Sequence, residues 1–201
     1  GRRVLAFAHA DTKRIDESAP FKFDGFAVIA DPVRKEVHEA VRLCKKANIK
    51  VKMLTGDNIL TATAVARELK LISGEEEAVE ASAIDKMSDA ELALALGRIS
   101  VIARSTPATK LRVVKALKNS GEVVAVTGDG INDAPAIRHA DVGIAMGVTG
   151  SQITKEAADV VLLDDSFSTV VRAVEFGRNV YRNLQRFIMF QLTVNLSAVF
   201  F

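Results

Sequence analysis

The sequence VTGDGINDAP, residues 126–135, gathers two aspartates, an asparagine and two glycines directly after the apolar run EVVAV at residues 122–126. Asp129 and Asp133 are four residues apart around a glycine-containing turn, where two carboxylates repel each other unless a cation or a proton lies between them. Carboxylate and amide oxygens are the ligands that Mg²⁺ prefers. The stretch therefore predicts a buried strand that ends at a magnesium-binding turn.

A simpler interpretation is that Asp129 and Asn132 only cap the helix expected over NDAPAIRHA, residues 132–140. Aspartate and asparagine are common at helix starts and in turns, where their side chains accept backbone N–H groups. Two acids, an asparagine and two glycines at one strand end favour the metal site over capping alone. Capping by one of the two residues is compatible with either interpretation.

The fold class expected is α/β with a largely parallel sheet, because apolar runs alternate with turn residues and helical patterns. The first twenty-odd residues, with RVLAFAH, are expected to contain a strand that leaves a different domain. A short helix is expected near residues 88–96 inside an exposed acidic excursion, and Asp165 or Ser166 is expected to cap a long final helix. The strands expected are residues 25–30, 49–54, 100–103, 122–126, 142–146 and 160–163, and the helices 33–47, 59–71, 107–119 and 151–158.

Two further polar clusters follow expected strands, TGDN at residues 55–58 and ARSTPATK at residues 103–110. In open parallel sheets ligands gather beyond the carboxyl ends of the strands. Lys110 near a helix start would add a positive charge where backbone N–H groups already favour an anion, while Thr55 and Gly56 offer a hydroxyl and an approachable amide. Taken together with the Asp129 turn, the clusters indicate phosphoryl transfer at one sheet edge.

The composition excludes several classes of protein. The chain has 201 residues, a formal net charge of +2 and one cysteine. The positive charge is not gathered into a basic tract, which argues against nucleic-acid binding. Cys44 lies in an apolar-periodic stretch and is expected to be a small buried side chain, so neither a disulfide framework nor a zinc site is expected. The start of the chain shows no signal-peptide pattern.

The last fifteen residues, FIMFQLTVNLSAVFF from Phe187, carry no charge. As a helix they would span about 22 Å, short of the roughly 30 Å hydrocarbon core, so we expect the first part of a membrane helix. The alternative is a buried core helix in a soluble domain. The preceding arginines suit the cytoplasmic flank of a membrane span; they are Arg172, Arg178, Arg182 and Arg186.

In combination, MLTGDN, DPVR, ARSTPATK and VTGDGINDAPAIRHADVGIAMG resemble the phosphorylation domain of P-type cation-transporting ATPases, members of the haloacid-dehalogenase-like superfamily. The apolar tail is similar to the fifth transmembrane helix of calcium pumps, and FQLTVN to that of the plasma-membrane type. The resemblance implies a Rossmann-like parallel sheet followed by a long helix that enters the membrane. It also implies three regions: the end of a nucleotide-binding domain (1–23), the phosphorylation domain (24–177), and a stalk with the start of the fifth transmembrane helix (178–201).

The resemblance also implies roles for individual residues. Asp129 would ligate Mg²⁺ with support from Asp133, and Asn132 would lie near the phosphate. Lys110 would neutralise the transferred phosphoryl group, which Thr55 and Gly56 would bind. The remaining implied assignments are Asp57 and Arg104 toward the nucleotide, Asn195 as a ligand of the transported cation, and Asp31, Pro32 and Arg34 as the hinge back from the nucleotide domain.

Two departures from the family pattern matter. Sarcoplasmic-type pumps carry a glutamate three residues after the asparagine that Asn195 matches, and here Ala198 stands there, which favours a single transported ion. The family's Asp-Lys-Thr-Gly-Thr nucleophile motif does not occur in these residues. We therefore expect the chain by itself to form no acyl phosphate and to lack one central strand.

The resemblance implies ATP, a transported cation with Ca²⁺ in first place, the lipid bilayer and the remaining domains of the same pump as partners. It implies a multi-pass membrane protein with this segment mostly on the cytoplasmic side. One alternative is a soluble haloacid-dehalogenase-like phosphatase with Asp31 as nucleophile, although Val33 stands where such enzymes usually carry a second aspartate. The other is a non-catalytic regulatory module.

Overall fold

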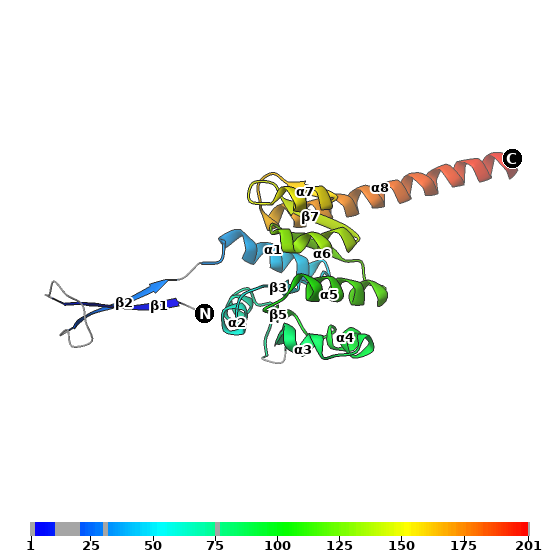
Figure 1. Ribbon diagram of the computed structural model, residues 1–201. Helices are drawn as coiled ribbons and strands as arrows, with labels where there is room; N and C mark the ends of the chain where they lie inside the picture. Colours follow the sequence, from blue (N-terminus) through cyan, green and yellow to red (C-terminus); the bar gives the residue numbers. More distant parts are fainter. Residues whose placement is uncertain (1–2, 11–20, 30–31, 75–76, 201) are drawn as a thin grey trace. The chain divides into compact units, whose positions relative to one another are not determined.

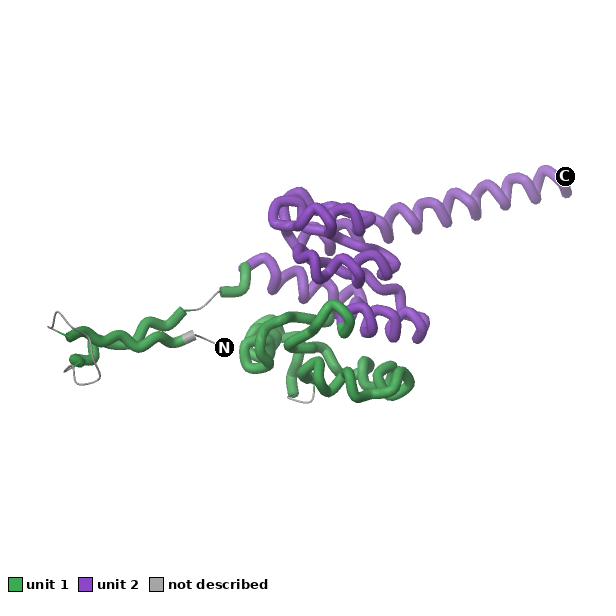
Figure 2. Tube along the Cα trace, in the orientation of Figure 1, with its two compact units in different colours: residues 1–34, 52–109 green, residues 35–51, 110–201 purple. Residues whose placement is uncertain are grey.

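The computed structural model describes residues 3–10, 21–29, 32–74 and 77–200 and divides the chain into two compact units (Figures 1 and 2). Unit 1 comprises residues 1–34 and 52–109, and unit 2 comprises residues 35–51 and 110–201.

The first two strands of unit 1, β1 (Arg3–His9) and β2 (Lys22–Ile29), form an antiparallel pair. The strand predicted at residues 25–30 is therefore observed as far as Ile29, and Ala30 lies outside the described residues; the prediction that this strand opens a parallel βα unit is wrong. Antiparallel pairing with the strand just before it needs only a hairpin, whereas parallel pairing needs a long crossover. The predicted domain boundary near Phe23 falls inside β2, and the three-region division itself stays a prediction.

The rest of unit 1 is a parallel sheet with strand order β3-β5-β4, formed by β3 (Met53–Leu54), β4 (Ala78–Glu80) and β5 (Val101–Ala103). Helix α2 (Ile59–Glu68) begins where the Asn58 side chain accepts the Thr61 amide at 2.9 Å. Two short helices, α3 (Ala81–Asp85) and α4 (Asp89–Ala95), follow β4. A core of small and branched side chains joins the sheet to α2; its buried members are Ala62, Ala66, Ile72, Val101 and Ala103.

The acidic segment at residues 73–92 is not merely the exposed excursion that was predicted. It supplies β4 to the parallel sheet, and the side chains of Ala81, Ile84 and Leu92 are buried. The strand was missed because the segment is rich in charged residues and because the partner of each β4 residue lies 23 positions further along the chain, as in the pair Ala78 and Val101. The short helix predicted near residues 88–96 is confirmed as α4.

Unit 2 contains a second parallel sheet with order β6-β7-β8, made of β6 (Ala125–Gly128), β7 (Val142–Met146) and β8 (Val160–Leu162). A short 3-10 turn, η1 (Ile131–Asp133), and helix α6 (Ala134–His139) connect β6 to β7, and α7 (Gln152–Ala157) connects β7 to β8. The unit also holds α1 (Lys35–Lys46), most of α5 (Pro107–Asn119) and the long α8 (Phe167–Phe200).

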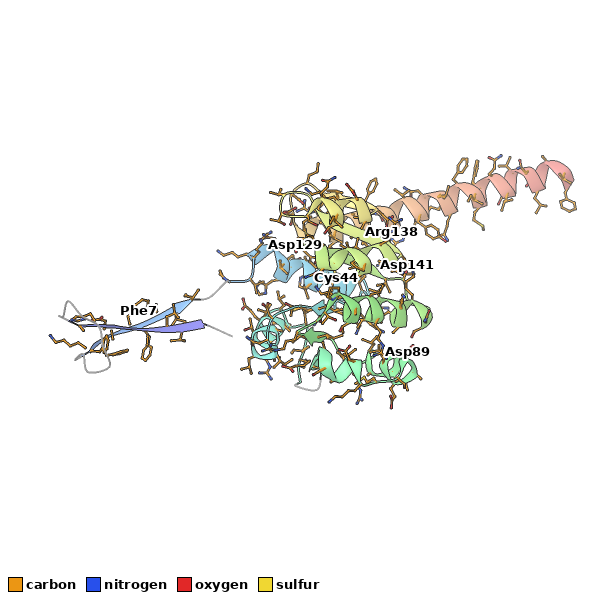
Figure 3. All side chains as sticks on the ribbon, viewed as in Figure 1. Phe7, Cys44, Asp89, Asp129, Arg138 and Asp141 are labelled. Atoms are coloured by element: carbon orange, nitrogen blue, oxygen red, sulfur yellow. The ribbon has the colours of Figure 1, made fainter. Side chains whose placement is uncertain are left out.

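The interior of unit 2 is apolar and includes Cys44, which Figure 3 labels on α1. Cys44 is 4% exposed and packs with Ala40 and with Val171 of α8, so the prediction of a small buried side chain is confirmed. Burial raises the pKa of its thiol, because the apolar surroundings disfavour the thiolate. A second cluster joins α5, β6 and α6; its buried members are Val114, Val124 and Ala136.

Helix α8 has 34 residues and runs out from the rest of unit 2 (Figure 2). Its last large side chains are exposed, among them Phe187 at 62%, Met189 at 66% and Phe200 at 77%. The alternative of a buried core helix is therefore not met in the part of unit 2 that the structure describes. Across the described residues, none of the helices offers an apolar run of the length that crossing a bilayer requires.

The parallel pairing that was predicted is confirmed for β3 to β8, but these strands form two separate three-stranded sheets and not one. No ladder within the described ranges joins them. The buried strand predicted at residues 122–126 is observed as β6, whose residues are exposed or half-buried because β6 lies at the edge of its sheet. The expectation that a central strand is lacking stays a prediction.

Candidate functional site

The segment Gly128–Asp133, which we call the GDGIND turn, leaves β6 and enters α6. The Asp133 carboxylate holds it in place with both oxygens: Oδ1 accepts a hydrogen bond from Lys110 Nζ at 2.6 Å, and Oδ2 accepts the Gly130 amide at 3.2 Å. The two charged side chains are 16% and 15% exposed. The structure therefore brings Lys110 and Asp133 together as a largely buried ion pair.

Gly128 has to be a glycine because Asp133 packs directly over it. A Cβ atom at Gly128 would lie 2.6 Å from the Asp133 Cβ and 2.7 Å from its carboxylate carbon. No real side chain tolerates such a distance, so the close packing of Asp133 explains the first glycine of the motif.

The Asp129 side chain, labelled in Figure 3, is exposed and makes no hydrogen bond to any of the described residues. The N-cap position of α6 is Asp133, so neither Asp129 nor Asn132 caps that helix, and the capping interpretation is wrong for both. The main chain at Asp129 is fixed, because its carbonyl accepts the Ser151 amide at 2.9 Å. A fixed backbone with an uncommitted carboxylate is what a ligand-binding aspartate needs.

The turn fits a magnesium ion in its donor set. Mg²⁺ is usually held by one or two carboxylates and keeps several waters or phosphate oxygens. Asp129 offers a free carboxylate, and Asp133 offers one that it shares with Lys110. Among the described residues no three His, Cys, Asp or Glu side chains gather as a metal cage, so this turn fits a hydrated metal rather than an all-protein site.

In unit 1 the parallel pairing of β3 with β5 brings together the residues that directly follow these two strands, Thr55–Asp57 and Arg104–Ser105. The Thr55 hydroxyl lies 3.1 Å from an Asp57 carboxylate oxygen and also accepts the Asp57 amide at 3.1 Å. The Ser105 amide donates to the Thr55 carbonyl at 2.8 Å, and the Arg104 amide to the Asp57 carbonyl at 2.9 Å. A Cβ added at Gly56 would meet no atom within 4 Å, so the space on that side of the chain is open.

Arg104 has a left-handed backbone with φ 51°, an uncommon conformation for a residue with a side chain. Its guanidinium Nε lies 3.6 Å from a Glu80 carboxylate oxygen, and the two side chains are 65% and 42% exposed. Such an exposed ion pair is weak. The guanidinium is therefore held only weakly by Glu80.

The predicted residues thus fall into two sets. Thr55, Gly56, Asp57 and Arg104 belong to unit 1, and Lys110, Asp129, Asn132 and Asp133 belong to unit 2. Their convergence on one sheet edge, and the role of each residue, stay predictions. Asn195 is exposed on α8, where its carbonyl oxygen lies 3.5 Å from the Gln191 amide nitrogen. Pro32 and Arg34 lie in neither a helix nor a strand, and Asp31 is outside the described residues.

The prediction named Asp165 or Ser166 as the residue that caps the final helix. Ser166 is the residue directly before α8, and its hydroxyl lies 2.8 Å from the Ser168 hydroxyl. Asp165 does not cap the helix; its carboxylate accepts the amides of Val148 at 3.0 Å and Thr149 at 2.8 Å, and the Thr149 hydroxyl at 2.9 Å. The hydrogen bond from the Val148 amide is the largest cause that lowers the pKa of Asp165 to about 2, followed by the Thr149 donors, while burial opposes the shift. Asp164 instead accepts the Ser166 amide at 3.1 Å.

One contact of the GDGIND turn was not predicted from the sequence. Thr154 is completely buried, and its hydroxyl donates to the Gly130 carbonyl at 2.9 Å. The only local signal near it was Ser151, a typical helix N-cap residue, whose hydroxyl accepts the Thr154 amide at 3.2 Å. Nothing in the spacing of the sequence links Thr154 to a turn 24 residues earlier.

A pocket of about 450 Å³ also lies in unit 2, between the end of α1 and the middle of α8. Its lining includes Leu43, Val174, Arg178 and Arg182, but neither Lys110 nor Asp129. The GDGIND turn is therefore not part of that pocket.

Residues 3–141 match the family model of haloacid dehalogenase-like hydrolases. The chain belongs to this family. The match includes the TGDN and ARSTPATK segments and the whole GDGIND turn, but it ends before Thr154 and Asp165. Thr154 and Asp165 therefore lie outside the part of the chain that matches the hydrolase family model.

Several named proteins are similar to this haloacid dehalogenase-like chain. Calcium-transporting ATPase 7, plasma membrane-type, of Oryza sativa subsp. japonica is 47% identical over 98% of the chain and 20% of the relative. Calcium-transporting ATPase 9, plasma membrane-type, of Arabidopsis thaliana is 49% identical over 85% of the chain and 16% of the relative. Calcium-transporting ATPase 1 of Bacillus cereus is 44% identical over 98% of the chain and 23% of the relative. The chain spans about a fifth of the length of these relatives.

Proposed function

We propose that this chain is part of an ATP-driven calcium pump, in which an aspartyl phosphate forms and is hydrolysed to drive ion transport across a membrane. The observation that carries the proposal is the 47% identity, over 98% of the chain, with a plasma-membrane-type calcium-transporting ATPase. The free Asp129 carboxylate beside the Lys110–Asp133 pair supports it from the structure. The phosphorylated aspartate would lie outside these 201 residues, since the Asp-Lys-Thr-Gly-Thr motif does not occur here.

In unit 2, Asp129 would be the main ligand of Mg²⁺ and Asp133 a supporting one. When bound, the metal would offset the negative charge on phosphate oxygens. Lys110 donates one hydrogen bond to Asp133 and has two further N–H donors for a phosphoryl oxygen. Asn132, whose side chain is exposed, would donate to the phosphate from the same turn.

In unit 1, the Thr55 hydroxyl and the Gly56 amide would bind phosphoryl oxygens. Asp57 holds the Thr55 hydroxyl in place and, with Arg104, would lie toward ATP. The hydrogen bonds of Ser105 and Arg104 to the main chain of Thr55 and Asp57 would keep this cluster rigid before ligand arrives, which lowers the entropic cost of binding.

The exposed apolar end of α8 would contact the lipid bilayer. The fifteen residues from Phe187 carry no charge, and Arg178, Arg182 and Arg186 precede them at four-residue spacing, which suits a cytoplasmic membrane surface. Asn195 would coordinate the transported cation together with groups from the remaining domains of the same pump. The chain would then lie mostly on the cytoplasmic side of a multi-pass membrane protein.

The proposal is tested in the full-length pump by substituting Asp129 with Asn. We expect phosphoenzyme formation from labelled ATP and Mg²⁺ to be abolished, because the amide keeps the size of the side chain but removes the charge that attracts the metal. Asp89→Asn, an exposed aspartate on α4, is the matched control and should leave phosphoenzyme levels unchanged. Ordinary phosphoenzyme formation by Asp129→Asn would contradict the role of Asp129.

The transported ion is tested by ATP hydrolysis of the complete protein in membranes with Ca²⁺, Mn²⁺, Na⁺ or K⁺. Stimulation by Ca²⁺ above the others is expected. Stimulation by another ion would reassign the cargo, and stimulation by none would favour the regulatory-module alternative.

A further inference from the structure

Two backbone carbonyls of the GDGIND turn are held by residues of the loop and helix that follow β7. The Ser151 amide donates to the Asp129 carbonyl at 2.9 Å, and the Thr154 hydroxyl donates to the Gly130 carbonyl at 2.9 Å. These two carbonyls belong to the peptide groups that follow Asp129 and Gly130. With both peptide groups fixed, the direction in which the Asp129 side chain leaves the backbone is fixed as well.

The Thr154 hydroxyl is well suited to hold the Gly130 carbonyl in place. Thr154 is 0% exposed, so its hydroxyl cannot exchange its protein partner for water without opening the structure. Because its proton is directed to Gly130, the Ser151 hydroxyl, 2.6 Å away, must donate to the Thr154 oxygen. The result is a short chain of hydrogen bonds, Ser151 to Thr154 to Gly130, in which every partner is satisfied.

The loop that leads into α7 is itself fixed by Asp165. The Asp165 carboxylate accepts three hydrogen bonds from Val148 and Thr149, and Asp165 lies two residues before α8 begins. The loop is also closely packed at both ends, since a Cβ at Gly147 would lie 2.5 Å from the Leu162 carbonyl oxygen and one at Gly150 1.9 Å from that of Met146. Asp165 therefore holds in place the segment from which Ser151 and Thr154 extend.

We propose that Thr154 is a positioning residue for the GDGIND turn, acting through the Gly130 carbonyl, and that Asp165 supports it by fixing the 147–150 loop. Neither side chain touches a reacting group. The benefit to metal binding rests on the proposed function of Asp129, whereas the positioning itself is a property of the protein alone. The positioning of the turn and its effect on metal binding can therefore be tested independently.

The positioning is tested by amide hydrogen exchange of the 201-residue chain without metal. Two amides report on the contacts directly: that of Asp133, which donates to the Gly130 carbonyl at 2.9 Å, and that of Ser151. Thr154→Val keeps the shape and removes the hydroxyl, and we expect it to speed exchange at both amides by about tenfold, as loss of one buried hydrogen bond predicts. Thr154→Ser keeps the hydroxyl and should stay within about twofold of the parent.

The control is Thr193→Val on α8, whose hydroxyl donates to the Met189 carbonyl in the same helix. It should leave exchange in the turn unchanged. Parent-like exchange in Thr154→Val, or equally fast exchange in Thr154→Ser and Thr154→Val, would overturn the role of Thr154.

Asp165→Asn provides a second variant that keeps the size of the side chain. It replaces one accepting oxygen with an NH₂ group, so exchange at the Val148 or Thr149 amide should accelerate, and exchange at Ser151 should follow to a smaller degree. Asp165→Asn with parent-like exchange at all three amides would overturn the supporting role. Because Asp165→Asn leaves the Thr154 hydroxyl in place, it still tests whether the 147–150 loop supports the turn if Thr154→Val fails to fold.

The consequence for the metal is tested by calorimetric titration of the same variants with MgCl₂ alone. Thr154→Val should bind Mg²⁺ about fivefold to tenfold more weakly than the parent, with affinity restored in Thr154→Ser. Parent-like affinity in Thr154→Val, despite faster exchange, would overturn the link between position and metal. Absence of binding by the parent would contradict the magnesium role in the proposed function, while the exchange data would still decide the positioning.

Discussion

At the scale of single residues, Asp133 is the centre of the GDGIND turn. Its carboxylate joins a cation on α5 to a backbone amide of the turn, with Lys110 Nζ at 2.6 Å and the Gly130 amide at 3.2 Å. A carboxylate committed in this way is a less available metal ligand than the uncommitted Asp129. The two aspartates of the motif therefore differ: the Asp133 carboxylate is committed to contacts within the protein, whereas the Asp129 carboxylate is not, which agrees with the ligand role proposed for Asp129.

Substitution of Gly128 with Ala tests the packing of Asp133. The new Cβ would collide with the Asp133 side chain, and we expect a loss of about 1–3 kcal/mol in the free energy of unfolding, as is typical of overpacking. Urea denaturation measures the loss. Gly74→Ala is the control, since no atom lies within 4 Å of its added Cβ, and it should change stability by less than about 0.5 kcal/mol. Equal stability of the two variants would contradict the crowded arrangement.

The lowered pKa of Asp165 predicts that the free energy of unfolding depends on pH in the acid range. Its pKa in the folded chain is lowered to about 2, below the ordinary value of 3.8, so the folded state favours the charged form. The stabilisation is complete above the ordinary pKa and is lost as the pH falls toward 2. The gap in urea midpoint between the parent and Asp165→Asn should therefore be constant from pH 7 to 5 and narrow from about pH 4 downward. A gap that stays constant to pH 2.5 would show that the charge of Asp165 does not stabilise the loop.

At the scale of elements, α4 is defined by reciprocal capping at its first turn. The Ser88 hydroxyl accepts the Glu91 amide at 3.4 Å, and the Glu91 carboxylate accepts the Ser88 amide at 2.8 Å. The hydrogen bond from the Ser88 amide, followed by the one that the Ser88 hydroxyl donates at 2.8 Å, lowers the pKa of Glu91. The cap fixes where α4 begins and hence directs Leu92, which is completely buried, into the interior of unit 1.

Ser88→Ala should therefore destabilise unit 1 by about 1 kcal/mol, the usual cost of losing a serine N-cap. The measurement is urea denaturation followed by far-ultraviolet circular dichroism. Ser82→Ala on α3, an exposed serine, is the control and should be close to neutral. An effect of Ser88→Ala no larger than that of Ser82→Ala would mean that the capping box does not set the start of α4.

At the scale of the whole molecule, the exposed apolar end of α8 governs behaviour in solution. Phe187 and Phe190 are 62% and 66% exposed, and no charged residue follows them. Exposed apolar surface of this extent promotes association, with a membrane or with other copies of the chain.

In buffer without lipid, we expect the chain to self-associate through this segment. Sedimentation velocity should show oligomers that increase with concentration and disappear when detergent micelles are added. The double variant Phe187→Ser with Phe190→Ser should shift the chain toward monomer. Phe176→Ser, which is 71% exposed in the parent but precedes the uncharged run, should not. A monomeric parent chain without detergent would contradict the prediction.

Several local elements can be predicted from the sequence alone, and so can the residue types from which the chemistry of the turn is proposed. Helix α5 begins at Pro107 and ends at Asn119, and β7 covers Val142–Met146, as the apolar periodicity and the helix-start signals predict. The residue types at Asp129, Asp133 and Lys110 indicated phosphate and metal chemistry without coordinates. Such features are encoded within a few residues of one another, because backbone propensity and side-chain period are local properties.

Only the tertiary structure decided which of these elements and side chains meet. The antiparallel pairing of β2 with β1, the place of β4 beside β5, and the contacts of Lys110 with Asp133, Thr154 with Gly130 and Asp165 with Val148 all join positions well separated along the chain. Each depends on how strands pair and on which polar groups burial forces to find a partner. A short stretch of sequence does not show which distant residue a side chain will contact. The difference between Asp133, which pairs with Lys110, and Asp129, whose carboxylate has no partner among the described residues, is therefore visible only in the folded chain.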